Sequence, residues 1–161
     1  IGVMGGTQFV HPQDEQFAYQ IGAMIAQEGW VLLNGGRDAG VMKASAKGAK
    51  DNGGITVGIL PVDNPDWASQ YIDIPIATGM GMARNVINIL SSDLIIALPG
   101  SAGTISEIAL ALKYGKEVIL FRFEVGGWLK PFQKEGKVYY INEVAELKTL
   151  VKERLAIIYN Y

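Results

Sequence analysis

The segment from Asp93 to Lys113 constrains the fold of this chain more than any other. A run of mostly apolar residues at 93–98 is followed by the turn sequence PGSAGTISE at 99–107 and then by a helical pattern at 108–113. This order predicts a buried strand, a glycine-rich turn and the start of a helix. Free backbone N–H groups and the positive end of the helix dipole converge at such a junction. We therefore expect it to bind an anion, and a phosphate is the natural occupant.

The residues of this turn have two interpretations. In the first, a phosphate is bound by five consecutive residues, which are Gly100, Ser101, Ala102, Gly103 and Thr104. The glycines lack a Cβ, so the backbone can approach a ligand closely, and Thr104 adds a hydroxyl donor. In the second, Thr104 and Glu107 form a capping box, T-x-x-E, which only satisfies backbone groups at the helix start. Because a capping box does not explain two glycines and a proline in one turn, we favour a ligand site.

Two more glycine-rich turns follow predicted strands, one after residues 1–4 and the other after residues 30–33. They add six expected ligand-binding residues, which are Gly5, Gly6, Thr7, Gly35, Gly36 and Arg37. Asp38, in the second of these turns, is instead expected to cap the helix that follows it. The carboxyl ends of parallel strands meet at one edge of a sheet, where open α/β sheets bind ligands. The convergence of three such turns is stronger support for a site than any single turn.

Apolar runs alternate with helical patterns along the whole chain. Strands are predicted at 1–4, 30–33, 55–60, 71–77, 93–98, 117–121 and 138–140. Helices are predicted at 13–27, 41–50, from 79 onward, at 108–113 and at 143–158, and a loop is expected at 123–137. Pro75 suggests that its strand lies at an edge. We predict an α/β fold in a single nucleotide-binding domain, 1–161, with a Rossmann-like, doubly wound, mostly parallel sheet and helices on both faces.

The composition excludes several classes of function. The chain has no cysteine and one histidine, His11, so we expect no disulfide, no thiol catalysis and no metal site. A net charge of −2 argues against a nucleic-acid partner. No apolar run approaches the ~20 residues of a membrane span and no signal peptide is visible, so we expect a cytoplasmic protein with no membrane partner. The sequence begins at Ile1 inside a predicted strand, and we expect a few residues to precede it.

Two well-known nucleotide-binding motifs are missing from the chain. The first turn reads GGTQ and not G-x-G-x-x-G, and Asn34 stands where a ribose-binding acidic residue would follow the second strand. No predicted strand is followed by the Gly-Lys-Ser/Thr of a P-loop. A nicotinamide-dependent dehydrogenase and a P-loop nucleotidase are therefore both disfavoured.

Arg84 lies in the first turns of its predicted helix, after two glycines. A cation is unfavourable at that position because it opposes the positive end of the helix dipole. This placement indicates an anionic partner, either a ligand phosphate or Glu107. The alternative is a surface arginine that pairs with Asp73 or Asp93. We favour a ligand contact.

The turn at 99–107 resembles the P-G-G-x-G-T-x-x-E motif of the Lonely Guy (LOG) family, long labelled "lysine decarboxylase-like". The sequence GGRDAGVM at 35–42 is similar to the G-G-G-x-x-G-L-M-G loop of that family, and Arg84 stands where the family keeps an arginine. The resemblance extends over nearly the whole chain in the same order. No lysine lies in a cofactor-anchoring context, so a lysine decarboxylase is not expected.

The chain departs from Lonely Guy enzymes at a few positions. Those enzymes usually read Arg-Lys and Glu-Glu, whereas this chain has Asn85 after the arginine and Ser106 before Glu107, and Ser101 replaces a motif glycine. The sequence looks more like a neighbouring branch of uncharacterised nucleotide-binding proteins and molybdenum cofactor carrier proteins.

The resemblance implies that the ligand is a phosphorylated nucleoside or nucleotide-like cofactor, either AMP-like or of molybdopterin type. In the carrier interpretation the ligand is only held. In the alternative, the protein is a nucleoside 5′-monophosphate phosphoribohydrolase that releases base and ribose 5-phosphate, with Arg84 and Glu107 as catalytic residues. The missing lysine and glutamate favour binding without robust hydrolysis. The family also implies a homodimer or higher oligomer, for which a predicted apolar stripe offers a surface unless it is core; the stripe is Met80, Ala83, Ile87 and Leu90.

Overall fold

A seven-stranded sheet runs through the molecule in the computed structural model, which describes residues 1–160. The strands are β1 (Gly2–Met4), β2 (Leu32–Asn34), β3 (Thr56–Leu60), β4 (Ile74–Ala77), β5 (Ile95–Ala97), β6 (Val118–Phe121) and β7 (Val138–Ile141). Their order is β4-β3-β2-β1-β5-β6-β7, and every neighbouring pair is parallel. The predicted Rossmann-like α/β fold is thereby confirmed.

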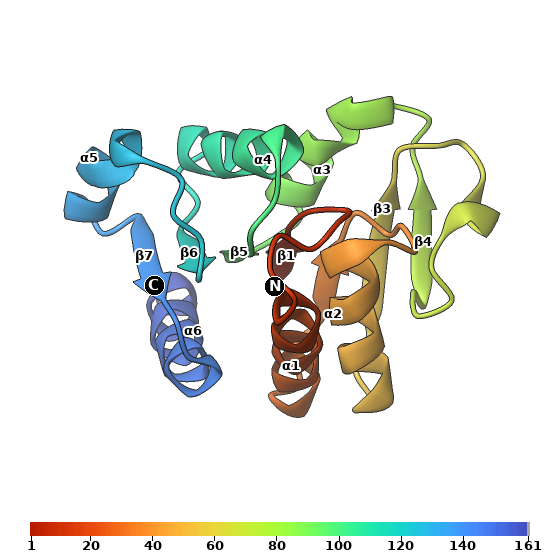
Figure 1. Cartoon of the computed structure of the whole chain (residues 1–161), viewed down its shortest axis with the longest axis horizontal. Helices are drawn as coiled ribbons and strands as arrows, with labels where there is room; N and C mark the ends of the chain where they lie inside the picture. The colour runs from red at the N-terminus through yellow and green to blue at the C-terminus, as the bar shows by residue number, and fades with distance from the viewer. Residues whose placement is uncertain (161) are drawn as a thin grey trace.

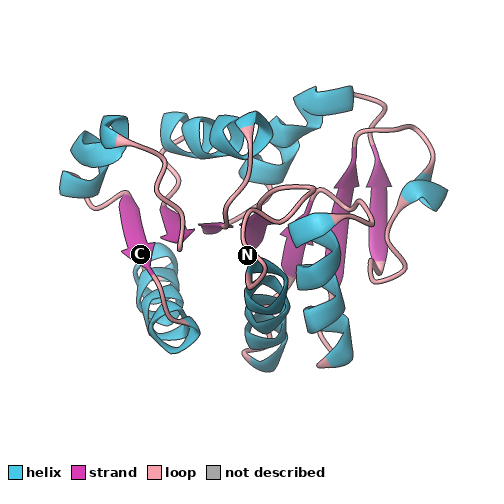
Figure 2. Cartoon of the chain, viewed as in Figure 1, coloured by secondary structure: helices cyan, strands magenta, loops and turns pink. Residues whose placement is uncertain are grey.

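Helices cover both faces of the sheet (Figures 1 and 2). The α-helices are α1 (Asp14–Gln27), α2 (Gly40–Asp51), α3 (Asn85–Leu90), α4 (Ala102–Lys113), α5 (Lys130–Lys134) and α6 (Val144–Tyr159). Short 3₁₀ helices are η1 (Pro65–Trp67), η2 (Gly81–Arg84) and η3 (Gly127–Leu129). In Figure 1, α1, α2 and α6 lie below the sheet, and α3, α4 and α5 lie above it.

Successive strand residues feed two separate apolar layers because side chains alternate across a sheet. Val3 and Ile96 belong to the layer that includes residues of α1, α2 and α6. Met4 and Ile95 belong to the layer that includes residues of α3 and α4. Both sides of the central strands are therefore buried, which explains why their sequences are continuously apolar.

The chain reverses the direction of its strand order at β1. This strand pairs with β2 on one side and with β5 on the other, and Gly2 is aligned with both Leu33 and Ile95. Such a reversal is a topological switch point, and the crevice outside its strand ends is the usual ligand site of an open α/β sheet. The glycine-rich turns that follow β1 and β5 both begin at this switch point.

β4 forms one edge of the sheet, as Pro75 suggests. All four of its residues are exposed, and Pro75 is aligned with Gly58 of β3. A proline lacks an N–H donor, which an edge strand tolerates on its open side. Ile74 and Ile76 are large apolar residues at this open edge.

Two expectations about the elements are wrong, and one open alternative is decided. Residues 123–137 are not all loop, since η3 and α5 lie within them. The helix expected from residue 79 onward begins as η2 and becomes α-helical only at Asn85. Of the apolar stripe, whose place on the surface or in the core was left open, Met80, Ala83 and Leu90 are exposed, whereas Ile87 is partly buried against the core layer of α3 and α4.

Within residues 1–160, every helix is too short or too polar to cross a bilayer.

Candidate functional site

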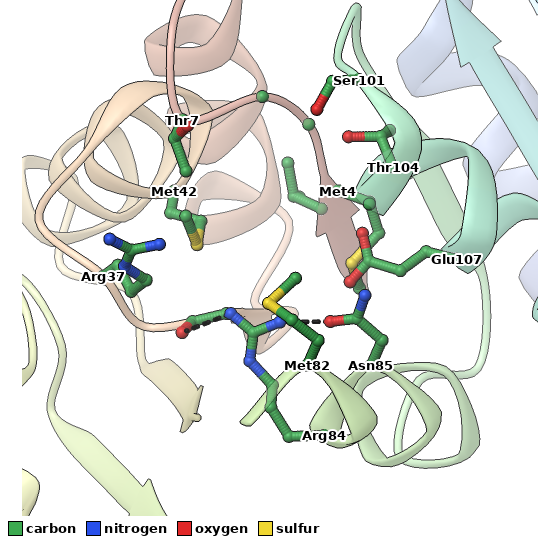
Figure 3. A pocket seen from close by; sticks show the side chains of 15 residues that line it. Met4, Thr7, Arg37, Met42, Met82, Arg84, Asn85, Ser101, Thr104 and Glu107 are labelled. Carbon is green, nitrogen blue, oxygen red and sulfur yellow. Dashed lines mark hydrogen bonds between the residues drawn. The ribbon is translucent and has the colours of Figure 1, made fainter. Parts of the chain in front are cut away.

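A cavity of about 240 Å³ lies at the carboxyl ends of β1, β2 and β5, where the three glycine-rich turns meet (Figure 3). Side chains from α2, η2, α3 and α4 complete its walls. The lining residues are Val3, Met4, Gly5, Gly6, Thr7, Gly35, Arg37, Met42, Met82, Arg84, Asn85, Ser101, Gly103, Thr104 and Glu107.

The turns after β1, β2 and β5 are locked together by backbone contacts. The Gly6 N–H donates to the Pro99 carbonyl at 3.2 Å, and the Val41 N–H donates to the Gly6 carbonyl at 3.0 Å. Gly40 has φ +50°, and a Cβ there would lie 2.2 Å from the Gly6 carbonyl oxygen. Only glycine fits this crossing, so the glycines at the site first serve to bring the turns together.

Two hydroxyl groups and a helix start gather in one corner of the cavity. In Figure 3, the side chains of Ser101 and Thr104 lie at the entry to α4, whereas Thr7 lies across the cavity near Met42. Ser101 is the N-cap residue of α4, and its side chain makes no capping hydrogen bond. The first N–H groups of a helix have no intrahelical acceptor, and they attract anions together with the dipole. This corner, formed by Ser101 and Thr104 at the start of α4, has the chemistry of a phosphate site; we call it the anion corner.

Gly100 is required by the packing of this corner. A Cβ on Gly100 would lie 2.1 Å from the Thr104 Oγ1 and 2.8 Å from the Gly6 nitrogen. At Gly103, by contrast, the nearest atom to an added Cβ is 3.8 Å away. The first glycine of the motif therefore allows the turns to touch, whereas the second leaves open space at the cavity wall.

The structure does not bring every predicted binding residue to this cavity. Gly36 has φ +74° and lies against Gly58, and its N–H donates to Asn34 Oδ1 at 2.8 Å, so it shapes the second turn. Gly100 lines an adjoining cavity, and Ala102, the first residue of α4, lines neither.

Arg84 is buried and held at three points. Its Nε donates to the Ile59 carbonyl at 2.8 Å, its Nη2 donates to the Gly35 carbonyl at 3.4 Å, and its Nη1 donates to Asn85 Oδ1. The interpretation as a surface arginine is wrong, because Arg84 is only 5% exposed and has no salt bridge among the described residues.

The Arg84 guanidinium is fixed as a charge in the cavity wall. Burial lowers its pKa, the Glu107 carboxylate acts in the opposite direction, and Arg37 lowers it further. Guanidinium nevertheless stays protonated in proteins. Gly35 is needed here, because a Cβ on it would lie 2.6 Å from the Arg84 Nη2.

Glu107 lies inside α4 and is 6% exposed, with a carboxylate that reaches the cavity (Figure 3). Its Oε1 accepts a hydrogen bond from the Asn88 Nδ2 at 2.8 Å. Burial raises the pKa of Glu107 to about 7, against the opposing effects of the Asn88 hydrogen bond and the Arg84 charge. The capping-box interpretation is wrong, because α4 begins at Ala102, which places Thr104 inside the helix.

The two positions at which this chain departs most from Lonely Guy enzymes contact each other. The Asn85 Nδ2 donates to the Ser106 Oγ at 3.3 Å, which joins α3 to α4. The Ser106 hydroxyl in turn donates to the Gly103 carbonyl at 2.6 Å. A neutral contact therefore occupies the place where the family pattern has a lysine and a glutamate.

Several residues of the site were not expected from the sequence. Asn88 holds Glu107, and its Oδ1 is buried without a hydrogen-bond partner. Helical spacing offered a signal for Asn88, since it lies four residues after Arg84 on a predicted helix. Three methionines also line the cavity, and no sequence pattern indicated this role for them; they are Met4, Met42 and Met82. Their flexible thioethers suit a flat apolar surface.

The remaining polar residues of the turns, which the sequence analysis considered, differ in their exposure and contacts. Arg37 is exposed and points into the cavity (Figure 3). Asp38 does not cap α2, whose N-cap residue is Ala39; it pairs with Lys43 at 2.9 Å and accepts from Ser69. His11 is exposed. Residues 1–160 contain no group of three or more histidine or acidic side chains suited to a metal ion.

Known proteins share this architecture. The molybdenum cofactor binding protein from Rippkaea orientalis has a TM-score of 0.89 and 44% identity, covering 96% of this chain and 95% of that one. The molybdenum cofactor carrier protein from Chlamydomonas reinhardtii has a TM-score of 0.86 and 40% identity, covering 96% of both chains.

A cytokinin riboside 5′-monophosphate phosphoribohydrolase from Mycobacterium tuberculosis is 36% identical over 100 residues. That match covers 61% of this chain and 54% of the enzyme, about half its length. The SLOG cluster4 family model matches residues 1–149. The chain is therefore a member of the SLOG cluster4 family, within the LOG-like and molybdenum cofactor carrier-like superfamily.

Proposed function

We propose that this protein binds a phosphorylated, nucleotide-like cofactor of molybdopterin type, holds it by its phosphate and does not hydrolyse it. The observation that carries the proposal is the anion corner, where Ser101 and Thr104 lie at the start of α4. Such a corner offers hydroxyl donors, free N–H groups and a favourable dipole to the same phosphate. The solved molybdenum cofactor proteins, similar over 96% of this chain, support the choice of cofactor.

Each wall of the cavity has a role in this proposal. Arg37, which is exposed, can move to contact the anion, whereas Arg84 supplies a fixed positive charge in the wall. The thioethers of Met4, Met42 and Met82 would pack against a flat heterocycle. The donors present in the anion corner fit the phosphate end of the cofactor.

Mass spectrometry of small molecules released from the purified chain tests the identity of the ligand, and titration with AMP tests the phosphate site. We expect Thr104→Val, which removes one hydroxyl at constant shape, to weaken AMP binding by ~10-fold. Thr149→Val is the control, because Thr149 lies on the exposed surface of α6. Absence of AMP binding at millimolar concentration, or equal affinity in both variants, would refute the phosphate site.

Phosphoribohydrolase activity is the second candidate, and the placement of Arg84 and Glu107 in one cavity favours it. A carboxyl with a pKa of about 7 is well suited to exchange a proton at neutral pH. If the protein is this enzyme, it releases adenine from AMP, and Glu107→Gln slows release by ~10²-fold without weakening binding. The neutral contact between Asn85 and Ser106 favours binding alone, and release of no base by the wild type would exclude the enzyme.

A further inference from the structure

A second cavity, of about 1260 Å³, opens on the same edge of the sheet. It lies over the carboxyl ends of β6 and β7 and is also lined by the loop after β1, at residues 10–14. The two cavities share the turn after β5. Pro99 and Gly100 line the second cavity, and Ser101 and Gly103 line the first.

The first cavity is smaller than an ordinary ligand site. Its volume of about 240 Å³ falls below the roughly 300–1,000 Å³ of ordinary ligand sites. The anion corner lies at the boundary of this cavity, on the turn that it shares with its neighbour. A ligand that fills the first cavity and places a phosphate on this corner can continue across the turn into the second cavity.

At one point the boundary between the two cavities consists of glycine backbone, without a side chain. A Cβ on Gly6 would lie 3.3 Å from the Gly100 Cα, so the two residues touch with no side chain between them. The crossing lies at the switch point between β1 and β5, and a dinucleotide spans the corresponding crevice in doubly wound folds. A linking pyrophosphate can lie close to the Gly6–Gly100 contact because neither residue carries a side chain.

The wall of the second cavity carries two cations, Arg122 and Lys130. Neither has a salt bridge among the described residues. The Arg122 guanidinium lies 4.8 Å from the centroid of the Phe17 ring and donates to the Asn142 carbonyl at 3.4 Å. Two acidic residues also line this cavity: Glu124, which is exposed, and Asp14, which is buried and accepts a hydrogen bond from the His11 N–H at 2.8 Å.

Arg122 has φ +50°, and within residues 1–160 it is the sole non-glycine residue with a positive φ. The left-handed region is unfavourable for a side chain of this kind, and such outliers concentrate at binding sites. The strained backbone turns the chain at the end of β6, where Arg122 begins the loop that forms one wall of the cavity.

We infer that the ligand is a two-part, pyrophosphate-linked molecule, with one half in each cavity and its second phosphate and second half contacted by Arg122 and Lys130. This inference rests on the proposed phosphate site and adds the class of ligand. The first half occupies the cavity of Arg84 and Glu107 and the pyrophosphate crosses the Gly6–Gly100 boundary. Tyr140 and Gln133 offer polar contacts to the second half.

Calorimetric titration of the full chain with AMP and with ADP-ribose tests this inference. AMP carries one phosphate, whereas ADP-ribose adds a second phosphate and a second ribose. We expect ADP-ribose to bind at least ~10-fold more tightly, because it gains hydrogen bonds to charged groups. Arg122→Gly and Lys130→Ala should each remove ~10-fold of the ADP-ribose affinity and leave AMP affinity unchanged. Glycine accepts the positive φ of position 122, so that variant should fold.

Lys134→Ala is the matched control, since Lys134 is exposed on the same short helix as Lys130 and does not line the cavity. Equal affinity for AMP and ADP-ribose would overturn the two-part ligand while the phosphate site stands. Tighter ADP-ribose binding that survives both Arg122→Gly and Lys130→Ala would also overturn it. Binding of neither probe would refute the phosphate site and this inference together.

Discussion

Glu107 is buried among packed helices and also lines the candidate site. It stays buried in α4 because the Asn88 amide holds one of its oxygens, while the cavity exposes the rest of the carboxyl to a ligand. The motif T-x-x-E indicated the importance of Glu107, but the partner Asn88 could not be found from a motif. Buried partners depend on how α3 and α4 pack, and that packing is not encoded in local spacing.

Glu107 should make the stability of the protein depend on pH. Its pKa is raised from 4.5 to about 7, so the folded state binds more protons than the unfolded state between these values. The free energy of unfolding therefore falls as pH rises through this window, by up to ~3 kcal/mol. We expect Glu107→Gln to match the wild type near pH 4.5 and to exceed it by up to ~3 kcal/mol at pH 8.

Urea unfolding at pH 5 and pH 8 measures this difference. Glu135→Gln, at an exposed position of the surface, is the control and should leave the pH profile unchanged. A constant difference between Glu107→Gln and the wild type at both pH values would show that Glu107 titrates in its ordinary range.

The two glycines of the central turn should respond oppositely to alanine. A Cβ on Gly100 would lie 2.1 Å from Thr104 Oγ1, so Gly100→Ala should lower stability by about 1–3 kcal/mol through overpacking. Gly103 is within α4 and has open space, so Gly103→Ala should be neutral or raise stability by up to ~1 kcal/mol. Thermal unfolding of the two variants compares them directly. Equal melting temperatures would contradict the close contact of the turns.

At the scale of elements, the contact between α3 and α4 distinguishes this chain from the enzymes it resembles. The sequence revealed the two departures, Asn85 and Ser106, but not that they touch. Long apolar runs and glycine-rich turns predicted most strands and helices, because those signals are local. The sequence analysis did not predict α5, because this helix has only five residues and glycines on both sides of it indicated a loop. Pro131 in its first turn is nevertheless typical of a helix start.

A double-mutant cycle at Asn85 and Ser106 tests whether opposite charges at these two positions would attract each other. Asn85→Lys alone should lower the free energy of unfolding by ~2 kcal/mol, because it buries an ammonium beside the Arg84 guanidinium. Ser106→Glu alone should have little effect at its exposed position. Together the two should recover at least ~1 kcal/mol of the loss. Chemical unfolding of the four proteins gives the coupling, and a coupling of zero would mean that the side chains do not meet.

At the scale of the whole molecule, the sequence predicted the layers but not the order of the strands. Continuously apolar strands imply a sheet covered on both faces, whatever the order. The position of β1 between β2 and β5 depends on packing between segments far apart in the chain. The same holds for the second cavity, whose walls come from 10–14, 99–100, 120–133 and 140–142.

The exposed apolar stripe leads us to predict self-association. Met80, Ala83 and Leu90 are exposed on or beside η2 and α3, close to the cavity residue Met82. Burial of such residues between two copies would remove them from water, which favours a dimer or larger oligomer. Light scattering should give a mass well above 17.4 kDa for the wild type and a lower mass for Leu90→Glu. A mass of one chain for the wild type would contradict the prediction.

The central position of β1 also bears on the order in which the protein can be made. The first residues of the chain form the middle strand, and Gly2 is aligned with Ile95 of β5. During synthesis, β1 has both of its neighbours only after β5 has left the ribosome. Contacts of such long sequence separation slow folding and leave apolar segments open to chaperones in the meantime. The three turns of the site come from these same strands, so the capacity to bind a ligand should arise late, when the centre of the sheet closes.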